Sequence, residues 1–124
     1  DKSPALYGNG EHTRDFVHVQ DVVDAMFLVI STPLESNPFH VYNIGSGKSI
    51  SLNDLIGDIN HAFSKCIHDF SIMRPTYEAE RPGDIRHSIA CIERARTAMD
   101  WSPSTALRDG IYDQVKAWLD VEGE

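Results

Sequence analysis

Apolar residues recur at helical spacing in four stretches of the chain, and each pattern predicts an amphipathic helix. The first helix is predicted from Asp21, which would act as its N-cap, to Thr32, directly before Pro33. Its apolar face would consist of Val22, Ala25, Met26, Val29 and Ile30. Residues 34–38 follow as a predicted loop.

The second predicted helix begins with a capping box. Ser51 and Asp54 are three residues apart, so the Ser51 hydroxyl can accept a hydrogen bond from the Asp54 amide. The apolar face that follows carries Leu52, Leu55, Ile56, Ile59 and Phe63. A short third helix is predicted over residues 92–99, before the break at 101–103. Thr105 is the predicted cap of a fourth helix, whose apolar positions are Leu107, Ile111, Val115 and Trp118.

Short alternating or β-branched runs predict strands between these helices. The runs cover residues 15–19, after a glycine turn, and then 41–44, 69–73 and 85–90. Strand and helix patterns mix along the chain without an internal repeat, a low-complexity segment or a linker. We therefore predict an α/β fold, a small mixed sheet with packed helices, in a single domain over residues 1–124.

Composition and charge narrow the possible partners. The chain has 124 residues, 41% hydrophobic and 24% charged, which is typical of a globular protein with a buried core. A net charge of −8 argues against nucleic acid or an anionic membrane, because both require clustered Lys and Arg. Cys66 and Cys91 lack metal or redox spacing. No apolar run approaches the ~18 residues of a membrane span and no signal peptide is seen, so we expect a cytoplasmic protein.

The turn at Arg81-Pro82-Gly83-Asp84 combines two groups suited to a nucleotide. Pro82 fixes its own φ angle and Gly83 permits a tight turn, so the support is stiff. The planar guanidinium of Arg81 suits the paired oxygens of a phosphate, and the Asp84 carboxylate can accept two hydrogen bonds from a ribose diol. A surface Arg–Asp ion pair, worth about 0–1 kcal/mol, would explain the same two residues equally well. The choice between a nucleotide site and a surface ion pair therefore depends on other motifs in the chain.

Three further patterns do not support a site of their own. Gly45-Ser46-Gly47-Lys48-Ser49 resembles the end of a phosphate-binding P-loop, but Tyr42 stands where that pattern requires a glycine. Tyr112 and Lys116 have the Tyr-x-x-x-Lys spacing of short-chain dehydrogenases, but no dinucleotide motif precedes them and a solvated helix face is favoured. The histidines show no metal-binding spacing, and structural or surface roles are expected for His12, His18, His40, His61, His68 and His87.

Several blocks occur in a characteristic order. They are Thr13-Arg14-Asp15-Phe16-Val17-His18-Val19, Val41-Tyr42-Asn43-Ile44-Gly45-Ser46-Gly47, Arg81-Pro82-Gly83-Asp84-Ile85-Arg86-His87-Ser88, and Trp101-Ser102-Pro103 before a helix that carries Ala117-Trp118-Leu119. Together they resemble the C-terminal, substrate-binding part of NAD-dependent nucleotide-sugar epimerases and dehydratases, in the extended short-chain dehydrogenase/reductase family. The resemblance is strongest to the UDP-sugar 4-epimerases and covers almost the whole chain from Leu6. It implies the fold of that part without the main dinucleotide-binding half.

The resemblance implies a phosphate and ribose site. Arg14 and Arg81 match the two arginines that clamp the diphosphate of the sugar nucleotide. Asp84 matches the acceptor for the ribose hydroxyls. Two guanidiniums can neutralise a diphosphate locally even on an acidic protein, through charge-assisted hydrogen bonds worth about 1.5–3 kcal/mol each.

Three more positions are implied around the nucleotide and the sugar. Phe16 and Leu52 match positions that pack around the nucleotide. Ser88 matches the position that limits the room beside the sugar, where a small side chain suits N-acetylated hexoses. Cys91 stands where the family usually has an aspartate that caps the next helix, a change that costs about 1 kcal/mol.

The chain also departs from the family pattern. The Gly-x-x-Gly-x-x-Gly turn that holds the NAD pyrophosphate, and the Ser/Thr that acts with Tyr-x-x-x-Lys in proton transfer, are not found. We therefore expect that the chain alone binds no NAD, has no catalytic residues of its own and is inactive. Two hypotheses follow: a truncated substrate-binding part of a UDP-sugar 4-epimerase, or an orphan interaction and oligomerisation module that has lost catalysis.

Expectations about partners follow from the same resemblance. UDP or a UDP-sugar is expected to bind weakly, and a separate catalytic half is a further candidate partner. In the related enzymes the first helix and residues 41–44 pack against the cofactor-binding half, so the faces of Val22, Met26, Val29 and Ile30 would risk exposure. Burial of such apolar surface drives self-association, and a homodimer is the commonest closed arrangement.

Overall fold

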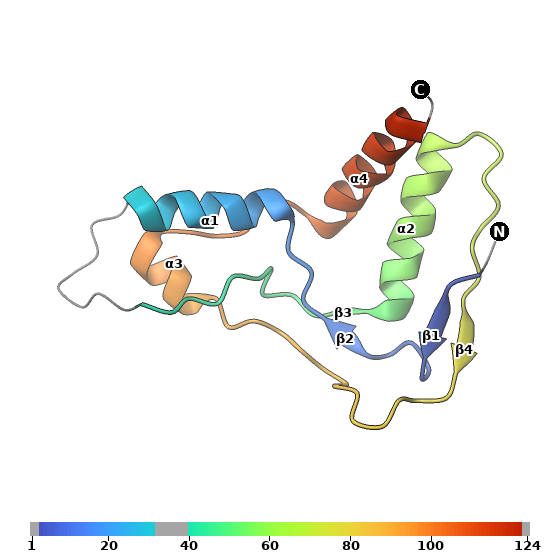
Figure 1. Cartoon of the computed structure of the whole chain (residues 1–124), viewed down its shortest axis with the longest axis horizontal. Coiled ribbons are helices and arrows are strands. Elements are labelled where there is room, and N and C mark those ends of the chain that lie inside the picture. Colours follow the sequence, from blue (N-terminus) through green and yellow to red (C-terminus); the bar gives the residue numbers. More distant parts are fainter. Residues whose placement is uncertain (1–2, 32–39, 123–124) are drawn as a thin grey trace.

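The computed structural model describes residues 3–31 and 40–122, in which helices and short strands are interspersed (Figure 1). The helices are α1 (Val19–Ser31), α2 (Leu52–Cys66), α3 (Glu93–Met99) and α4 (Leu107–Glu122). The strands are β1 (Ala5–Tyr7), β2 (Thr13–Arg14), β3 (Ile50–Ser51) and β4 (Thr76–Glu78). The predicted α/β class is confirmed, and the predicted loop at 34–38 lies outside the described residues.

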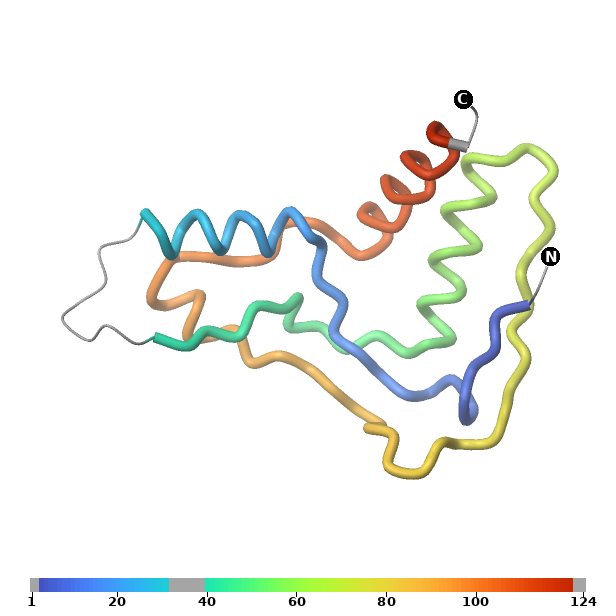
Figure 2. The backbone as a smooth tube through the Cα atoms, in the orientation of Figure 1, coloured from blue at the N-terminus to red at the C-terminus, as the bar shows by residue number. Residues whose placement is uncertain are grey.

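The strands form two small sheets that join distant parts of the sequence. β1 pairs in parallel with β4, and β2 pairs antiparallel with β3. A single parallel bridge between Thr13 and His87 places the segment around His87 along the other edge of β2. Figure 2 shows residues 15–18 leading from β2 up to α1, while residues 84–92 carry the chain back toward α3.

Two separate hydrophobic clusters hold the helices in place. The first lies between α1 and α3 and consists of Ala25, Ile92, Ala95, Met99 and Trp101, with Tyr42 and Ile44 packed against it. The second lies between α2 and α4, which run side by side in Figure 1, and has Ala62, Ile111 and Val115 at its centre. The helical periodicity identified the buried faces only in part. Ala25, Ile111 and Val115 of the predicted faces are buried, but Met26, Ile30 and Trp118 are exposed.

The predicted helices are confirmed, but two of their predicted caps are wrong. Ser51 Oγ accepts the Asp54 amide at 3.0 Å, as the capping box requires. Asp21 instead lies inside the first turn of α1, and its carboxylate accepts hydrogen bonds from Ser104 and Thr105. Thr105 consequently turns its hydroxyl to Asp21, 3.4 Å away, and α4 begins only at Leu107.

Three predicted strands are wrong, because residues 15–19, 41–44 and 69–73 lie outside the strands of the described chain. The predicted strand at 85–90 is reduced to one bridge, formed by His87 with Thr13. Side chains take the place of a ladder partner in these segments. The Asp15 carboxylate accepts the amides of Ser46, Gly47 and Ala90, and Asn60 exchanges two hydrogen bonds with the backbone of Met73. Apolar alternation was a poor guide to burial in these segments, where several of the apolar residues are exposed: Val41 75%, Ile72 71%, Ile85 63% and Ile89 57%.

Neither a membrane-spanning helix nor a metal-binding cluster is present among the described residues. None of the helices in residues 3–31 and 40–122 has the length and apolar character needed to cross a membrane. The same ranges hold no group of three His, Cys, Asp or Glu side chains placed to bind a metal ion.

Candidate functional site

Strand β2 gathers the predicted site residues, because segments that carry them lie on both of its edges. On one edge Arg14 pairs with Ile50 of β3, and the Leu52 amide donates to the carbonyl of His12 at 3.1 Å. On the other edge the Ser88 amide donates to the Thr13 carbonyl at 3.2 Å. Residues almost 75 positions apart in the sequence, such as Arg14 and Ser88, are thus brought to one strand.

Arg14 and Asp84 form an ion pair at this site. Arg14 Nη2 lies 3.0 Å from Asp84 Oδ1, and the two side chains are 31% and 30% exposed. Arg14 Nη1 also donates to the carbonyl of Thr13 at 2.9 Å, which fixes the plane of the guanidinium. A guanidinium has five donors and a carboxylate about four acceptor sites, so both groups keep hydrogen-bonding capacity for a ligand.

Arg81 lies in the same turn as Asp84. The Asp84 amide donates to the Arg81 carbonyl at 3.2 Å, and Gly83 has φ +80°, so the predicted turn is confirmed. The Arg81 guanidinium stacks on the ring of Tyr7, 3.5 Å from its centre. A cation–π contact holds the guanidinium plane while its N–H edges stay available to an anion.

His12 is a residue of this site that the sequence pattern did not single out. It is only 3% exposed, and its Nε2 lies 3.2 Å from Oε1 of Glu80. Its Nδ1 lies 3.7 Å from Oδ2 of Asp84 and has no hydrogen-bond partner among the described residues. Its position two residues before Arg14, and so on the same side of β2, was the available signal.

Asp15 is the second residue that was missed. Its carboxylate accepts hydrogen bonds from the Ser46 hydroxyl and amide, both at 2.6 Å, and from the amides of Gly47 and Ala90, both at 3.0 Å. Burial alone would raise the Asp15 pKa, but these hydrogen bonds outweigh it and lower the pKa. Gly45 is required beside this carboxylate, since a Cβ there would lie 2.5 Å from Ala90 Cβ and 2.8 Å from Asp15 Oδ2.

The glycine-rich loop does not fit a dinucleotide or P-loop phosphate. The amides of Ser46 and Gly47, which would have to face a phosphate, donate to the Asp15 carboxylate instead. Helix α2 begins only at Leu52, so its N-terminus does not follow the loop directly. The loop at residues 45–47 is therefore a structural contact of Asp15 rather than a phosphate cradle.

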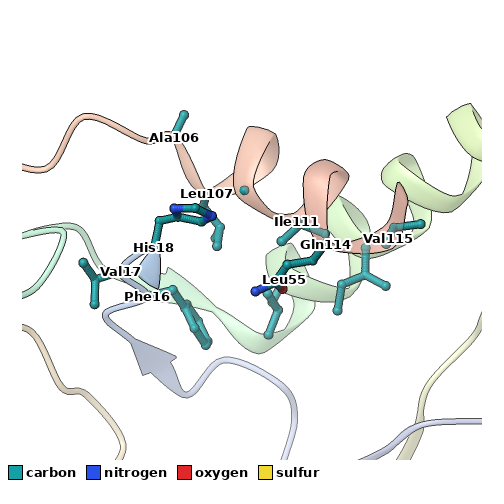
Figure 3. Close-up of a pocket in the computed structure, with 11 residues that line it drawn as sticks. Phe16, Val17, His18, Leu55, Ala106, Leu107, Ile111, Gln114 and Val115 are labelled. Atoms are coloured by element: carbon teal, nitrogen blue, oxygen red, sulfur yellow. The ribbon is translucent and has the colours of Figure 1, made fainter. Parts of the chain in front are cut away.

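Phe16 lines a mostly apolar cavity of about 380 Å³ (Figure 3). Residues 16–18 form one wall, and Leu55 of α2 and Leu107, Ile111 and Val115 of α4 form the others. Phe16 also borders a neighbouring cavity of about 430 Å³ that contains Lys48 and Arg96. Phe16 therefore lines two neighbouring cavities. Leu52 lines neither of them and is half-buried at the start of α2.

Ser88 lines a third cavity, of about 590 Å³. Its walls are formed by residues 42–45 and 88–91 together with Asp15 and Val17. Tyr112 and Lys116, the pair with dehydrogenase spacing, are both exposed on α4 and line none of these three cavities.

Comparison with known proteins gives a consistent result. The family model described as GDP-mannose 4,6 dehydratase matches residues 1–114. A putative UDP-glucose 4-epimerase of Methanocaldococcus jannaschii is 31% identical over 118 residues, which are 95% of this chain and 34% of that protein. The UDP-glucose 4-epimerase of Mycolicibacterium smegmatis is 32% identical over 115 residues, 93% of this chain and 34% of its own length.

Solved structures agree with these relatives. The UDP-glucose 4-epimerase of Thermotoga maritima, solved with UDP-glucose, has a TM-score of 0.81 and 28% identity and covers 98% of this chain. The UDP-N-acetylglucosamine 4-epimerase of Methanobrevibacter ruminantium, solved with UDP-N-acetylmuramic acid, has a TM-score of 0.79 and 30% identity. The chain covers 36% of each of these two structures, so it spans about a third of the length of its relatives.

Proposed function

Because the chain belongs to the GDP-mannose 4,6-dehydratase family, and corresponds to the C-terminal part of its NAD-dependent epimerases and dehydratases, we propose that it binds a UDP-sugar. In this proposal, the chain is the nucleotide-sugar-binding portion of a UDP-glucose or UDP-N-acetylglucosamine 4-epimerase. Arg14 and Arg81 bind the diphosphate and Asp84 binds the ribose hydroxyls. Phe16 and Leu52 pack around the nucleotide, and Ser88 faces the sugar.

The observation that carries this proposal is that Asp84 pairs with Arg14 and shares a turn with Arg81. Arg14 reaches Asp84 at 3.0 Å across 70 residues of sequence, and Arg81 stands in the same turn as Asp84. All three side chains are partly exposed, so a ligand can reach them. The Arg14–Asp84 ion pair alone contributes about 0–1 kcal/mol, which is a weak reason to hold both groups in this arrangement.

Calorimetric titration of UDP into the 124-residue chain tests this site. We expect weak binding of UDP, no tighter binding of UDP-N-acetylglucosamine, and a loss of about tenfold or more in affinity for Arg81→Ala, since each charge-assisted bond is worth 1.5–3 kcal/mol. Arg94→Ala is the matched control, because Arg94 is an exposed arginine over the ring of Tyr42, 5.4 Å from its centre. An unchanged affinity for Arg81→Ala contradicts the proposed phosphate site.

We further propose that these 124 residues alone are catalytically inactive. Hydride transfer needs a bound nicotinamide, and the Gly-x-x-Gly-x-x-Gly turn expected to hold NAD is not found in these residues. With NAD and UDP-galactose added, the purified chain is expected to form no UDP-glucose. Turnover above background would contradict this, and Tyr112 and Lys116 would then be the first residues to replace.

A second candidate function is an interaction module, favoured by a different observation. Helix α1 exposes several large apolar side chains: Val19 is 65% exposed, Met26 60%, Phe27 65% and Ile30 79%. Such a row on one helix is unusual for a surface in water and is typical of a covered face. The two candidates are distinguished by UDP binding, which the interaction module does not require.

A further inference from the structure

The two arginines of the candidate site are oriented in different ways. Arg14 uses two of its donors inside the protein, one on the carbonyl of Thr13 at 2.9 Å and one on Asp84 at 3.0 Å. The Arg81 guanidinium is exposed and makes no hydrogen bond or ion pair with the other described residues. What holds it is the ring of Tyr7, whose centre lies 3.5 Å from the Cζ atom of Arg81.

The Tyr7 ring is a firm support for that guanidinium. Tyr7 is the last residue of β1, is half-buried, and pairs with Glu78 of β4. The next amide, that of Gly8, donates to the Glu78 carbonyl at 2.9 Å, so backbone pairing continues to the end of both strands. Because the strands are parallel, Tyr7 and the turn that carries Arg81 leave the sheet at the same end.

The stack leaves the binding edge of the guanidinium open. A separation of 3.5 Å is direct van der Waals contact and is well inside the ~6 Å range of cation–π interactions. The ring covers one face of the guanidinium, whereas the N–H groups point outward in its plane, where paired phosphate oxygens bind. Glu80, the acidic residue directly before Arg81, is bonded to Arg86 at 3.1 Å and so does not neutralise Arg81.

We propose that Tyr7 is a positioning residue for the diphosphate: its ring stacks on Arg81 and holds the guanidinium in the plane in which it binds phosphate. The inference rests on the proposed function, in which Arg81 binds the diphosphate. An exposed arginine without the ring samples many rotamers and loses that freedom on binding, whereas the stack restricts the rotamers before the ligand arrives. The effect of Tyr7 on the ligand is therefore transmitted through Arg81.

Titration of UDP into the isotopically labelled 124-residue chain, followed by NMR, tests this role. Tyr7→Leu removes the ring and should weaken UDP binding about fivefold, the cost of ordering one long side chain. Tyr7→Phe keeps the stacking face and should stay within about twofold of the wild type. Tyr77→Leu is the matched control in the same sheet and should also stay within about twofold, because Tyr77 is 55% exposed on β4 and its hydroxyl donates to Asn53 at 3.0 Å.

A double-mutant cycle separates positioning from direct contact. In an Arg81→Ala background the guanidinium is absent, so Tyr7→Leu should change UDP affinity by less than about twofold. An equal loss in both backgrounds would mean that the ring contacts the nucleotide itself, and this overturns the inference while the UDP site stands. An unchanged affinity for Tyr7→Leu in the wild-type background has the same consequence. Absence of UDP binding to the wild type overturns the proposed function, and the inference with it.

Spectra of the wild type decide the question even if Tyr7→Leu fails to fold. A guanidinium 3.5 Å above an aromatic ring lies in its shielding cone, so the Arg81 side-chain protons should resonate upfield of those of Arg94, which lies 5.4 Å from the centre of the Tyr42 ring. We expect this upfield shift to persist when UDP saturates the chain, because positioning requires the stack in the bound state. Loss of the shift on UDP binding, or its absence from the free chain, overturns the inference.

Discussion

At the scale of single residues, two carboxylates connect segments that share no regular secondary structure. Asp15 ties residues 46–47 to Ala90, and Asp21 ties the start of α1 to the segment before α4. Asp21 is 1% exposed and accepts the amides of Ser104 and Thr105 at 2.9 and 3.2 Å. Its own carbonyl accepts the indole N–H of Trp101 at 3.1 Å, which anchors the first hydrophobic cluster.

We expect Asp21→Asn to lower the free energy of unfolding by about 3 kcal/mol, because an amide group in place of a carboxylate leaves buried donors unpaired. Denaturant unfolding followed by circular dichroism measures this change. Asp24→Asn is the control on the same helix: Asp24 is exposed and accepts a hydrogen bond from Gln20 at 2.9 Å, so its variant should stay within about 0.5 kcal/mol of the wild type. A loss below about 1 kcal/mol for Asp21→Asn contradicts the assigned role.

The shifted pKa values of Asp15 and Asp21 predict how the stability of the fold depends on pH. Burial alone would raise the pKa values of Asp15 and Asp21, but their hydrogen bonds outweigh it and lower both below the ordinary value of 3.8. The unfolded chain therefore binds protons at a higher pH than the folded chain, so this stabilisation is complete above the ordinary value and is lost as the pH falls below it. Unfolding measured at about pH 6 and about pH 3 should show the loss, and Asp21→Asn should show a smaller one.

The chemistry of the candidate site could be predicted from the sequence only in part. Arg81 and Asp84 are close in sequence, and a Pro-Gly turn brings them together whatever the rest of the fold does. Asp21 was predicted as a helix cap because an aspartate before an apolar run is the usual signal for one. Its real partners, Ser104 and Thr105, lie more than 80 residues away, and no local pattern reports contacts at that distance.

At the scale of elements, the helices were predictable and the strands were not. Each helix carries its own apolar period, which does not depend on a partner. The strands here have two or three residues each, too short for an alternating pattern to be recognised. What defines them is the pairing of distant segments, such as Ala5 with Thr76, and a single sequence does not reveal such pairing.

The cap of α2 provides a test at this scale. Ser51 Oγ accepts the Asp54 amide at 3.0 Å and donates to Asp54 Oδ2 at 2.7 Å. Ser51→Ala should cost about 1 kcal/mol in unfolding free energy, since the first turn of the helix loses a capped amide. Ser64→Ala is the control on the same helix, because the Ser64 hydroxyl only bonds back to His61 at 2.8 Å on an exposed surface. Equal stabilities of the two variants would contradict a stabilising cap.

At the scale of the whole molecule, the chain carries a row of exposed apolar residues along α1. Of the four residues expected to lie exposed, Met26 and Ile30 are exposed, but Val22 and Val29 are half-buried, and Val29 packs against the first cluster. Val19 and Phe27 complete the exposed row, at 65% each. The chain spans about a third of its relatives, and the contact of this face with the remaining two-thirds is a proposal that rests on the resemblance.

For the 124 residues studied by themselves, we predict a homodimer with α1 at or near the interface. Apolar surface of this kind drives association at about 25 cal/mol per Å², and a two-fold pair buries the same face of both copies. Sedimentation velocity at micromolar concentration should show the dimer, and Phe27→Glu should convert it to monomer by placing a charge in the row. Val29 is unsuited to this test because a charge there would disturb the cluster between α1 and α3.

The matched control for this prediction is Val121→Glu. Val121 is 74% exposed, but it lies near the end of α4, away from the row on α1, so the dimer should persist in this variant (Figure 1). Loss of the dimer in both variants would place the interface elsewhere or report general electrostatic repulsion on an acidic chain. A wild type that sediments as a monomer would show that the α1 row does not drive self-association. The same row would then be free for the larger part of a nucleotide-sugar epimerase, and adding that part separately should protect α1 amides from hydrogen exchange.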